Sequence, residues 1–251
     1  VKKYKTFQSK MINKIINKIK YNCTCIIKIF LKDNNIHSKY AYNRFREEEL
    51  ESSYAYFKKY FYNSIFLKKN DLRKYAIKKA LDNDANEENL FLEFGVYKGE
   101  STNFLSTFLK KKLHAFDSFE GLEEDWLGFH HAAGDFGGIE VPKLNKNVNL
   151  LIERIQDTLP DFLIKNKNFK ISFIHIDVDN YSVAKFILQN IKSFLSDGAI
   201  ICFDEFYNYQ GWKNGEFKAL TETFKDDEFS YRCFADEGEQ VVIQYDKKTN
   251  I

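Results

Sequence analysis

Five short hydrophobic runs follow one another from Asn89 onward, with segments long enough for helices between them. The runs read NLFLEFG, LHAFDSF, NVNLLIERI, KISFIHID and GAIICFD. Strands that alternate with helices build βαβ units, and such units form a mostly parallel sheet with helices on both faces. The spacing therefore predicts an α/β fold.

Two further runs, FSYRCF and QVVIQY, are joined by ADEGE, a five-residue turn that contains Gly238. Two runs this close together predict a β-hairpin. The predicted parallel sheet thus ends in an antiparallel pair of strands.

The clearest helix is predicted between the fourth and fifth runs. Ser182 can cap its start, and Asp197 with Gly198 can end it. Its apolar stripe consists of Val183, Phe186, Ile187, Ile191 and Phe194.

The segment before Asn89 is predicted to be helical. Residues 1 to about 35 interleave lysines with apolar residues, which indicates a basic amphipathic helix for a membrane surface or a partner. The alternatives are an ordinary helix on the protein's own surface and a partly disordered arm. Residues 44–69 look helical and aromatic-rich, and another helix is predicted from the cap residue Asn70 to Leu81. We expect a helical extension over residues 1–70 and the α/β domain over residues 71–251.

Composition indicates a globular protein, because 44% of the 251 residues are hydrophobic and 17% are aromatic. The formal net charge of +2 favours no particular partner, and no nucleic-acid partner is expected. Four scattered cysteines favour neither a disulfide framework nor a zinc site, so we expect a reducing, cytoplasmic location. No stretch approaches the roughly 20 apolar residues of a membrane span.

The segment LEFGVYKGEST ends the first run and opens a helix. Gly95 allows a sharp turn, Gly99 lets the backbone approach a ligand, and the free N–H groups of the helix that opens at Ser101 can face polar or anionic atoms. Glu93 would repel a pyrophosphate but suits a ligand with an ammonium group. A tight turn without a ligand is the alternative.

Asp117 ends the second run, about twenty residues after this turn, where an acidic side chain can accept both ribose hydroxyls. A nicotinamide dinucleotide site would prefer G-x-G-x-x-G, but Tyr97 stands where its second glycine belongs. Adenosine with a cationic tail is therefore the favoured ligand. Gln156 and Asp157 in the third run reach the same edge and suit the adenine amino group; Asp157 as a helix cap is an equal alternative.

HIDVDNYS and FDEF end the fourth and fifth runs, so Asp177, Asp204 and Glu205 are expected to meet at one edge of the sheet. Crowded carboxylates repel one another unless a cation or a proton lies among them. A divalent ion such as Mg²⁺ suits such oxygen ligands. Separately solvated acids, or acids paired with lysines, are the alternative.

Six segments, in chain order, resemble the bacterial class I S-adenosylmethionine-dependent methyltransferases similar to macrocin O-methyltransferase. They are LEFGVYKGEST, FDSFEGLEEDW, QDTLP, HIDVDNYS, FDEFYNYQGWKNGEFKAL and GEQVVI, and they span roughly residues 90 to 245. The resemblance implies a Rossmann-like seven-stranded sheet whose last strand is antiparallel. It also implies S-adenosylmethionine as methyl donor and a Mg²⁺-dependent transfer to a sugar hydroxyl.

Carried over residue by residue, the resemblance places Glu93, Gly95 and Gly99 at the methionine end of the donor and Asp117 at its ribose. Asp177, Asp204 and Glu205 fall on the metal positions, and Asp179 falls where some relatives have the general base. Two departures stand out. Relatives that bind metal tend to have Asp-Asp where this chain has Asp204-Glu205, and they usually have a glycine before DTLP, where this chain has Glu153 and Arg154.

The mechanism expected from these residues is an in-line methyl transfer in which a carboxylate takes the proton of the hydroxyl. Asp179 is the candidate base, with helix capping as its alternative. The segment GFHHAAGDFGG is expected to close over the substrate, with His130 or His131 as base or sugar contact; an ordinary surface loop is the alternative. The aromatic residues Tyr207, Tyr209 and Trp212 suit stacking on sugar faces or packing on this loop.

We thus expect a metal-assisted O-methyltransferase that modifies a sugar or glycosylated small molecule. A nicotinamide-dependent oxidoreductase and a non-catalytic donor-binding or scaffold protein are the alternatives, and a homo-oligomer is expected. The predicted donor-binding residues are Glu93, Gly95, Tyr97, Gly99, Ser101, Asp117, Ser118, Gln156, Asp157 and Asp177. The predicted catalytic residues are Asp179, His130 and His131, and the predicted metal ligands are Asp177, Asp204 and Glu205.

Overall fold

A computed structural model describes residues 41–84, 88–129 and 131–247. The chain divides into two compact units, Val1–Glu47 and Glu48–Ile251. The predicted basic helix of the first 35 residues and the predicted catalytic residue His130 lie outside the described residues. The second unit carries the sheet and the site described below.

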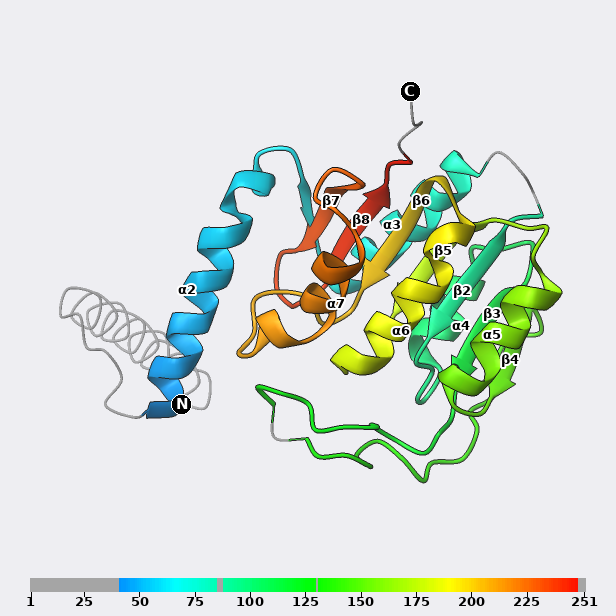
Figure 1. Cartoon of the computed structure of the whole chain (residues 1–251), viewed down its shortest axis with the longest axis horizontal. Helices are drawn as coiled ribbons and strands as arrows, with labels where there is room; N and C mark the ends of the chain where they lie inside the picture. The colour runs from blue at the N-terminus through cyan, green and yellow to red at the C-terminus, as the bar shows by residue number, and fades with distance from the viewer. Residues whose placement is uncertain (1–40, 85–87, 130, 248–251) are drawn as a thin grey trace, which may run out of the picture. The chain divides into compact units, whose positions relative to one another are not determined.

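The described residues form one sheet of eight strands in the order β1-β7-β8-β6-β5-β2-β3-β4 (Figure 1). Only β8 runs against its neighbours β6 and β7, and every other pair is parallel. The strands are β1 Ile65–Leu67, β2 Leu90–Phe94, β3 Leu113–Asp117, β4 Val148–Ile152, β5 Ile171–Ile176, β6 Leu195–Phe203, β7 Phe229–Ala235 and β8 Val241–Tyr245.

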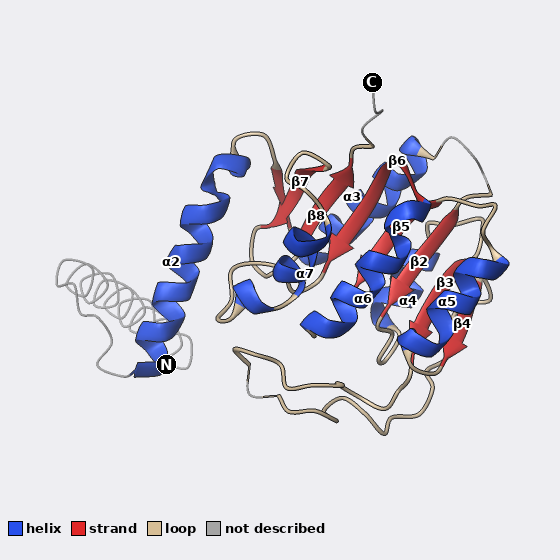
Figure 2. Ribbon diagram, in the orientation of Figure 1, coloured by secondary structure: helices blue, strands red, loops and turns tan. Residues whose placement is uncertain are grey.

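Helices cover both faces of the sheet (Figure 2). One hydrophobic core contains side chains of α5, α6 and α7, and the core on the other face contains side chains of α3 and α4. The helices are α2 Ala41–Phe61, α3 Lys69–Asn83, α4 Glu100–Ser106, α5 Ile155–Lys165, α6 Tyr181–Ile191 and α7 Glu216–Thr223, with short 3₁₀ turns η1 Lys192–Phe194 and η2 Trp212–Asn214. No helix in the described part of the chain is long and apolar enough to cross a membrane.

The predicted α/β architecture, with seven predicted strands and the terminal antiparallel strand, is confirmed. An eighth strand, β1, lies inside the segment 44–69 that was expected to be helical throughout. The helix α2 ends at Phe61, and Ile65–Leu67 pair instead with Cys233–Ala235 of β7. This pairing is long-range, so local helical spacing did not reveal it.

The helix α6 also differs at both ends from the prediction. Its N-cap is Asn180, and Ser182 lies in the first turn, where its N–H and hydroxyl both donate to Glu124. Asp197 and Gly198 do not end the helix but lie within β6. The carboxylate of Glu124, from a distant loop, thus accepts the free N–H of the first turn of α6, a role that the sequence assigned to a local cap residue.

The C-terminal half of α2 is fixed by Phe57, which is fully buried. Its ring contacts Phe206, Trp212 and Phe234 at centroid distances of 6.0, 5.3 and 5.6 Å. Part of the predicted extension therefore belongs to the hydrophobic core. The domain boundary at residue 70 itself stays a prediction.

Candidate active site

A cavity of about 600 Å³ opens at the carboxyl ends of the parallel strands β2, β3, β5 and β6. Parallel strands deliver their carboxyl ends to one edge, which is where ligands bind in open α/β sheets. The predicted site residues that line it are Gly95, Tyr97, Ser101, Asp117, Ser118, Asp177, Asp179, Asp204 and Glu205. The sequence did not point to five other lining residues, Lys69, Arg73, Trp126, Phe136 and Arg154.

Several predicted residues do not line this cavity: Glu93, Gly99, Gln156, Asp157 and His131. Gln156 donates instead to Glu123 at 2.8 Å, and Asp157 lies exposed in the first turn of α5. The carboxylate of Asp157 suits that position, because a helix N-terminus favours negative charge.

The turn after β2 requires Gly95. Its φ is +89°, and an added Cβ would lie 1.8 Å from the carbonyl oxygen of Asp177. Gly99, with φ +77°, packs on Leu144, which an added Cβ would approach to 2.7 Å. Gly95 therefore allows the close approach of the chain after β2 to the end of β5. Gly99 allows the β3–β4 segment to pack on the start of α4.

Asp117 organises the walls of the cavity through three backbone hydrogen bonds. Its Oδ2 accepts from Val96 N–H at 2.7 Å and from Tyr97 N–H at 2.8 Å, and its Oδ1 accepts from Phe119 N–H at 2.7 Å. Tyr97 and Phe119 both have a positive φ, which costs energy unless surrounding contacts hold it. One carboxylate therefore fixes the turn after β2 and the turn after β3.

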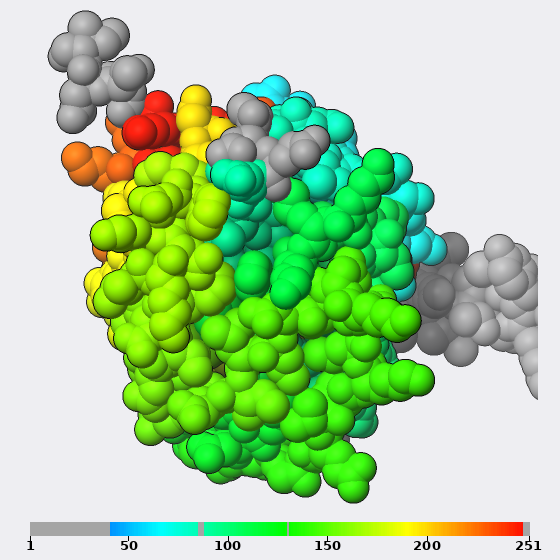
Figure 3. Space-filling model, turned by 90° about the vertical axis from the view of Figure 1, so that its right-hand side faces the viewer, coloured from blue at the N-terminus to red at the C-terminus, as the bar shows by residue number. Residues whose placement is uncertain are grey.

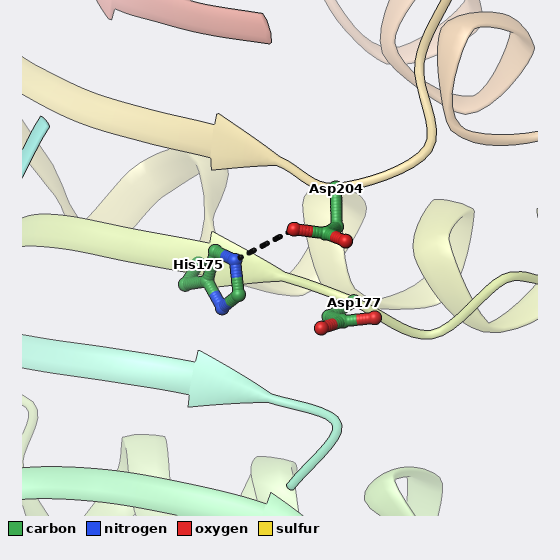
Figure 4. A group of neighbouring side chains, drawn as sticks. All are labelled: His175, Asp177 and Asp204. Atoms are coloured by element: carbon green, nitrogen blue, oxygen red, sulfur yellow. Dashed lines mark ion pairs between the residues drawn. The ribbon is translucent and has the colours of Figure 1, made fainter. Parts of the chain in front are cut away.

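Glu93 and His175 form a fully buried pair on neighbouring strands. The Oε1 of Glu93 lies 3.0 Å from Nδ1 of His175, and Nε2 of His175 lies 3.5 Å from Oδ1 of Asp204 (Figure 4). Burial lowers the pKa of His175, but its hydrogen bonds to Asp204 and Glu93 outweigh this and raise the pKa to about 9. Glu93 therefore binds an imidazolium behind the cavity wall.

Asp204 is also held by two cations of α3. Its Oδ2 lies 2.6 Å from Nζ of Lys69, and its Oδ1 lies 2.6 Å from Nη2 of Arg73, which is itself 3.7 Å from Asp177. Burial alone would raise the pKa of Asp204, but His175, Arg73 and Lys69 together hold that pKa well below its usual range. Neither cation was predicted as a site residue from the sequence, although their i,i+4 spacing places them on one helix face.

Asp177, Asp179 and Glu205 form a second acidic group, with one oxygen of each within 4.8 Å of the others. Burial, followed by repulsion from Asp204, raises the pKa of Asp177 to about 8, and burial raises the pKa of Asp179 to about 6. The Oε2 of Glu205 is buried and has no hydrogen-bond partner among the described residues. These acids are therefore short of positive charge.

Glu216 is a further buried acid that the sequence did not indicate. It is 1% exposed, and its Oε2 accepts from the N–H of Glu205 at 3.3 Å. Burial and the charge of Asp177 raise the pKa of Glu216 well above its usual range. Its first-turn position in α7 follows Gly215 and carries no sequence signal for this role.

The described residues of the long segment 118–147 between β3 and β4 form part of the green surface in Figure 3, and several of them line the cavity. Glu123 accepts from Arg154 at 2.7 Å, and Glu124 binds the start of α6. His131 contacts Asp135 through Nδ1 at 3.0 Å and stacks on Trp126 at a centroid distance of 5.7 Å. Glu123 and Glu124, which precede the predicted substrate loop of residues 128–138, thus fasten the segment to two helices.

The aromatic residues expected to stack on sugars or to pack on the loop are part of the core, and Tyr209 also packs on Phe129 of that loop. Tyr207, Tyr209 and Trp212 are 6%, 3% and 0% exposed. Their burial follows from the aromatic cluster around Phe57, whose partners come from distant parts of the chain. The aromatic residues that line the cavity are Tyr97, Phe116, Phe119, Trp126 and Phe136.

Residues 92–206 match the sequence family described as "Methyltransferase domain". No curated protein sequence matches the chain. Among solved structures, CalS11, a calicheamicin methyltransferase, is similar with a TM-score of 0.60 and 20% identity, covering 80% of this chain and 86% of that chain. An apo structure of CalS11, described as a TDP-rhamnose 3'-O-methyltransferase, has a TM-score of 0.54 and 19% identity, covering 80% and 87%.

The O-methyltransferase NovP is similar with a TM-score of 0.50 and 16% identity, covering 70% of this chain and 78% of that chain. At these identities the solved structures show the shared fold. The matching family and this fold agree with the six sequence segments and with a cavity at the carboxyl edge of the sheet. Residues 92–206 therefore match a methyltransferase domain, in agreement with the S-adenosylmethionine-dependent methyltransferases that the six sequence segments resemble.

Proposed function

We propose that the protein is an O-methyltransferase that transfers the methyl group of S-adenosylmethionine to a hydroxyl of a sugar or a glycosylated small molecule. One observation carries the proposal: the turn fixed by Asp117 and the carboxylate of Asp179 line the same cavity. The printed description of CalS11 as a TDP-rhamnose 3'-O-methyltransferase supports a sugar acceptor. The expected homo-oligomer, and the membrane surface or partner expected for the first 35 residues, stay predictions of the sequence.

In this proposal Asp117 binds the ribose hydroxyls of the donor, because its carboxylate lies at the cavity wall and its Oδ1, which accepts one backbone hydrogen bond, retains a further lone pair. Asp177, rather than Glu93, faces the cationic end of the donor, because Asp177 lines the cavity next to Gly95. Glu93 has a positioning role: it holds His175, which in turn contacts Asp204.

Asp179 is the proposed acceptor of the hydroxyl proton. It lines the cavity, and its positive φ of 60° holds it at the start of α6, just before the N-cap Asn180. In-line transfer requires the acceptor oxygen, the methyl carbon and the sulfur to be aligned, so the base must be fixed relative to the donor. The hydrogen bonds of Asn180 and Ser182 to Glu124 support that position.

A divalent cation fits part of the predicted ligand set. Both oxygens of Asp204 already lie 2.6 Å from cationic nitrogens, so Asp204 is not free to bind a metal. Asp177, Asp179 and Glu205 would hold the ion, because their oxygens converge and the Oε2 of Glu205 has no partner in the described structure. Such an ion would lower the pKa of the acceptor hydroxyl. Asp179 would both help to hold such an ion and accept the proton of the hydroxyl.

Two measurements test the proposed function. Titration calorimetry of the purified protein should show binding of S-adenosylmethionine and not of NAD(H). Incubation with radiolabelled S-adenosylmethionine and a panel of nucleotide sugars and oligosaccharides should then label a sugar product. Binding of NAD(H) alone would favour the oxidoreductase alternative. Donor binding without transfer to any hydroxyl would favour a non-catalytic protein.

A further inference from the structure

We propose that Trp126 and Phe136 form the acceptor platform of this enzyme, on which the apolar face of an uncharged pyranose ring stacks. The inference rests on the proposed function and adds the class of acceptor. It starts from the placement of these two aromatic side chains, which line the same cavity as Asp179. Their ring centroids lie 6.4 Å apart at an interplanar angle of 64°.

The platform lies at the acidic end of the cavity. Asn180, the residue after Asp179, donates through Nδ2 to the carbonyl of Glu124 at 3.1 Å. Glu124 is two residues before Trp126, so this bond ties the aromatic segment to the end of β5 where the proposed base lies. An acceptor stacked on Trp126 can therefore present a hydroxyl toward Asp179.

The platform is preformed. Phe129 packs on Trp126 at 4.3 Å and on Tyr209 at 5.3 Å, and His131 lies 4.7 Å from Phe136. An added Cβ at Gly128 would lie 1.6 Å from the carbonyl oxygen of Gln210, which shows how closely the segment approaches the loop after β6. Little conformational entropy remains to be lost when an acceptor binds.

Aromatic walls beside polar groups suit a ring with one apolar face and several hydroxyls. Tyr97 packs against Phe136 at 5.7 Å and extends the apolar wall toward the donor turn. Pockets of this kind use aromatic side chains for contact area and a few polar groups for orientation. The C–H face of a pyranose fits the wall, and its hydroxyls fit the carboxylates.

Charge favours an uncharged ring over an acidic one. Asp177, Asp179 and Glu205 gather at this end. The basic residues that line the cavity are engaged elsewhere: Lys69 and Arg73 pair with Asp204, Arg154 pairs with Glu123, and Lys98 lies over the Tyr97 ring. With no divalent cation bound among them, these acids disfavour a carboxylate on the sugar, because partly buried charges are poorly screened. The platform therefore selects against uronic acids.

Tryptophan fluorescence gives a direct test, because the chain has only two tryptophans. Trp212 is fully buried, whereas Trp126 is partly exposed at the cavity, so acrylamide should quench Trp126 selectively. With S-adenosylhomocysteine bound, which cannot donate a methyl group, methyl glucoside, methyl mannoside and methyl rhamnoside are each added. We expect at least one of them to protect against quenching, and methyl glucuronide to protect less.

Three variants sharpen this test. Trp126→Phe should remove the fluorescence that acrylamide quenches. This result would assign the quenched fluorescence to the platform. Phe136→Ala keeps the reporter and should weaken pyranoside protection about tenfold, while calorimetry shows unchanged affinity for S-adenosylhomocysteine. Leu127→Ala is the matched control on the same segment, since Leu127 is 59% exposed and does not line the cavity; it should leave protection unchanged.

The outcomes separate the inference from the proposed function. Absence of protection by every pyranoside, in a protein that binds S-adenosylhomocysteine, would overturn the platform and leave the donor site standing. Protection by catechol alone, or by the glucuronide as strongly as by neutral pyranosides, would also overturn it. Failure to bind S-adenosylhomocysteine at all would overturn the proposed function instead.

Discussion

Asp117 shows how one side chain can serve both the fold and the ligand. Its two oxygens accept three backbone hydrogen bonds from the turns after β2 and β3, and the same carboxylate lines the cavity. Hydrogen bonds to a charged group are worth about 1.5–3 kcal/mol each. Removing this carboxylate is therefore expected to loosen the turn and to remove the ribose contact together.

We predict that Asp117→Ala weakens S-adenosylmethionine binding about tenfold to a hundredfold, measured by titration calorimetry. Asp161→Ala, which removes an exposed carboxylate from α5, is the control and should leave the affinity unchanged. Unchanged affinity in a folded Asp117→Ala protein would refute this donor site.

Asp179 is predicted to act in the chemical step. Asp179→Asn should lower the single-turnover rate of methyl transfer about 10²- to 10⁴-fold, because removal of a general base typically has that effect. Donor affinity should stay unchanged, since the amide keeps nearly the same shape. A variant that retains the full rate would assign Asp179 to helix capping.

The cation proposal predicts a difference between neighbouring acids. Asp177→Asn and Glu205→Gln should weaken Mn²⁺ binding, measured by calorimetry, with partial rescue of turnover at high Mg²⁺. Asp204→Asn should weaken Mn²⁺ binding less, because the oxygens of Asp204 already contact Lys69 and Arg73. Full activity of the wild-type protein in excess EDTA, with no metal found by elemental analysis, would contradict a role for a metal ion.

At the scale of elements, the helix α3 contributes cationic side chains to the site that its own sequence does not predict. The apolar side of α3 packs on the sheet through Leu72, Ala76 and Ile77. This packing orients the side chain of Arg73 toward Asp204 in the acidic site. Arg73 is 8% exposed, so its bond with Asp204 is a buried ion pair. Breaking a buried pair leaves an uncompensated charge, which is far more destabilising than losing a surface pair.

We predict that Arg73→Met lowers the free energy of unfolding by about 3 kcal/mol, measured by urea denaturation. Lys74→Met is the matched control, because Lys74 is the next residue of the same helix and is exposed. A loss below about 0.5 kcal/mol for Arg73→Met, the range of ordinary surface substitutions, would show that Lys69 and His175 suffice to hold Asp204.

At the scale of the whole molecule, the compact unit Glu48–Ile251 holds every described residue that lines the cavity. Its sheet begins with β1, and its core includes Phe57 of α2. We therefore expect the part of the chain needed for donor binding to start before residue 70, and the first 35 residues stay predicted to lie outside it.

We predict that a chain lacking residues 1–35 binds S-adenosylmethionine as tightly as the full chain. A chain that starts at Asp71 should lose cooperative unfolding, because it lacks β1 and Phe57. Calorimetry and thermal unfolding followed by circular dichroism measure the two effects. A folded 36–251 protein unable to bind donor would mean that the first 35 residues contribute to the site.

The sequence by itself determined the alternation of strands and helices, the terminal hairpin, the turn at Gly95 and the edge where Asp117, Asp177 and Asp204 gather. These features depend on local spacing and on the rule that parallel strands end at one edge, so short motifs carry them. The order of strands along the sheet decided which side chains of neighbouring strands meet. It set β2 beside β5, which pairs Glu93 with His175 in register and withdraws Glu93 from the cavity.

Only the tertiary structure decided which charges and rings meet. Lys69 and Arg73 reach Asp204 across more than 130 positions of sequence, β1 needs the edge of β7, and Trp126 rather than Trp212 lines the cavity. Each of these contacts depends on how a helix or segment packs on the sheet. Packing selects the buried face of each element through long-range contacts, and local spacing does not encode those contacts.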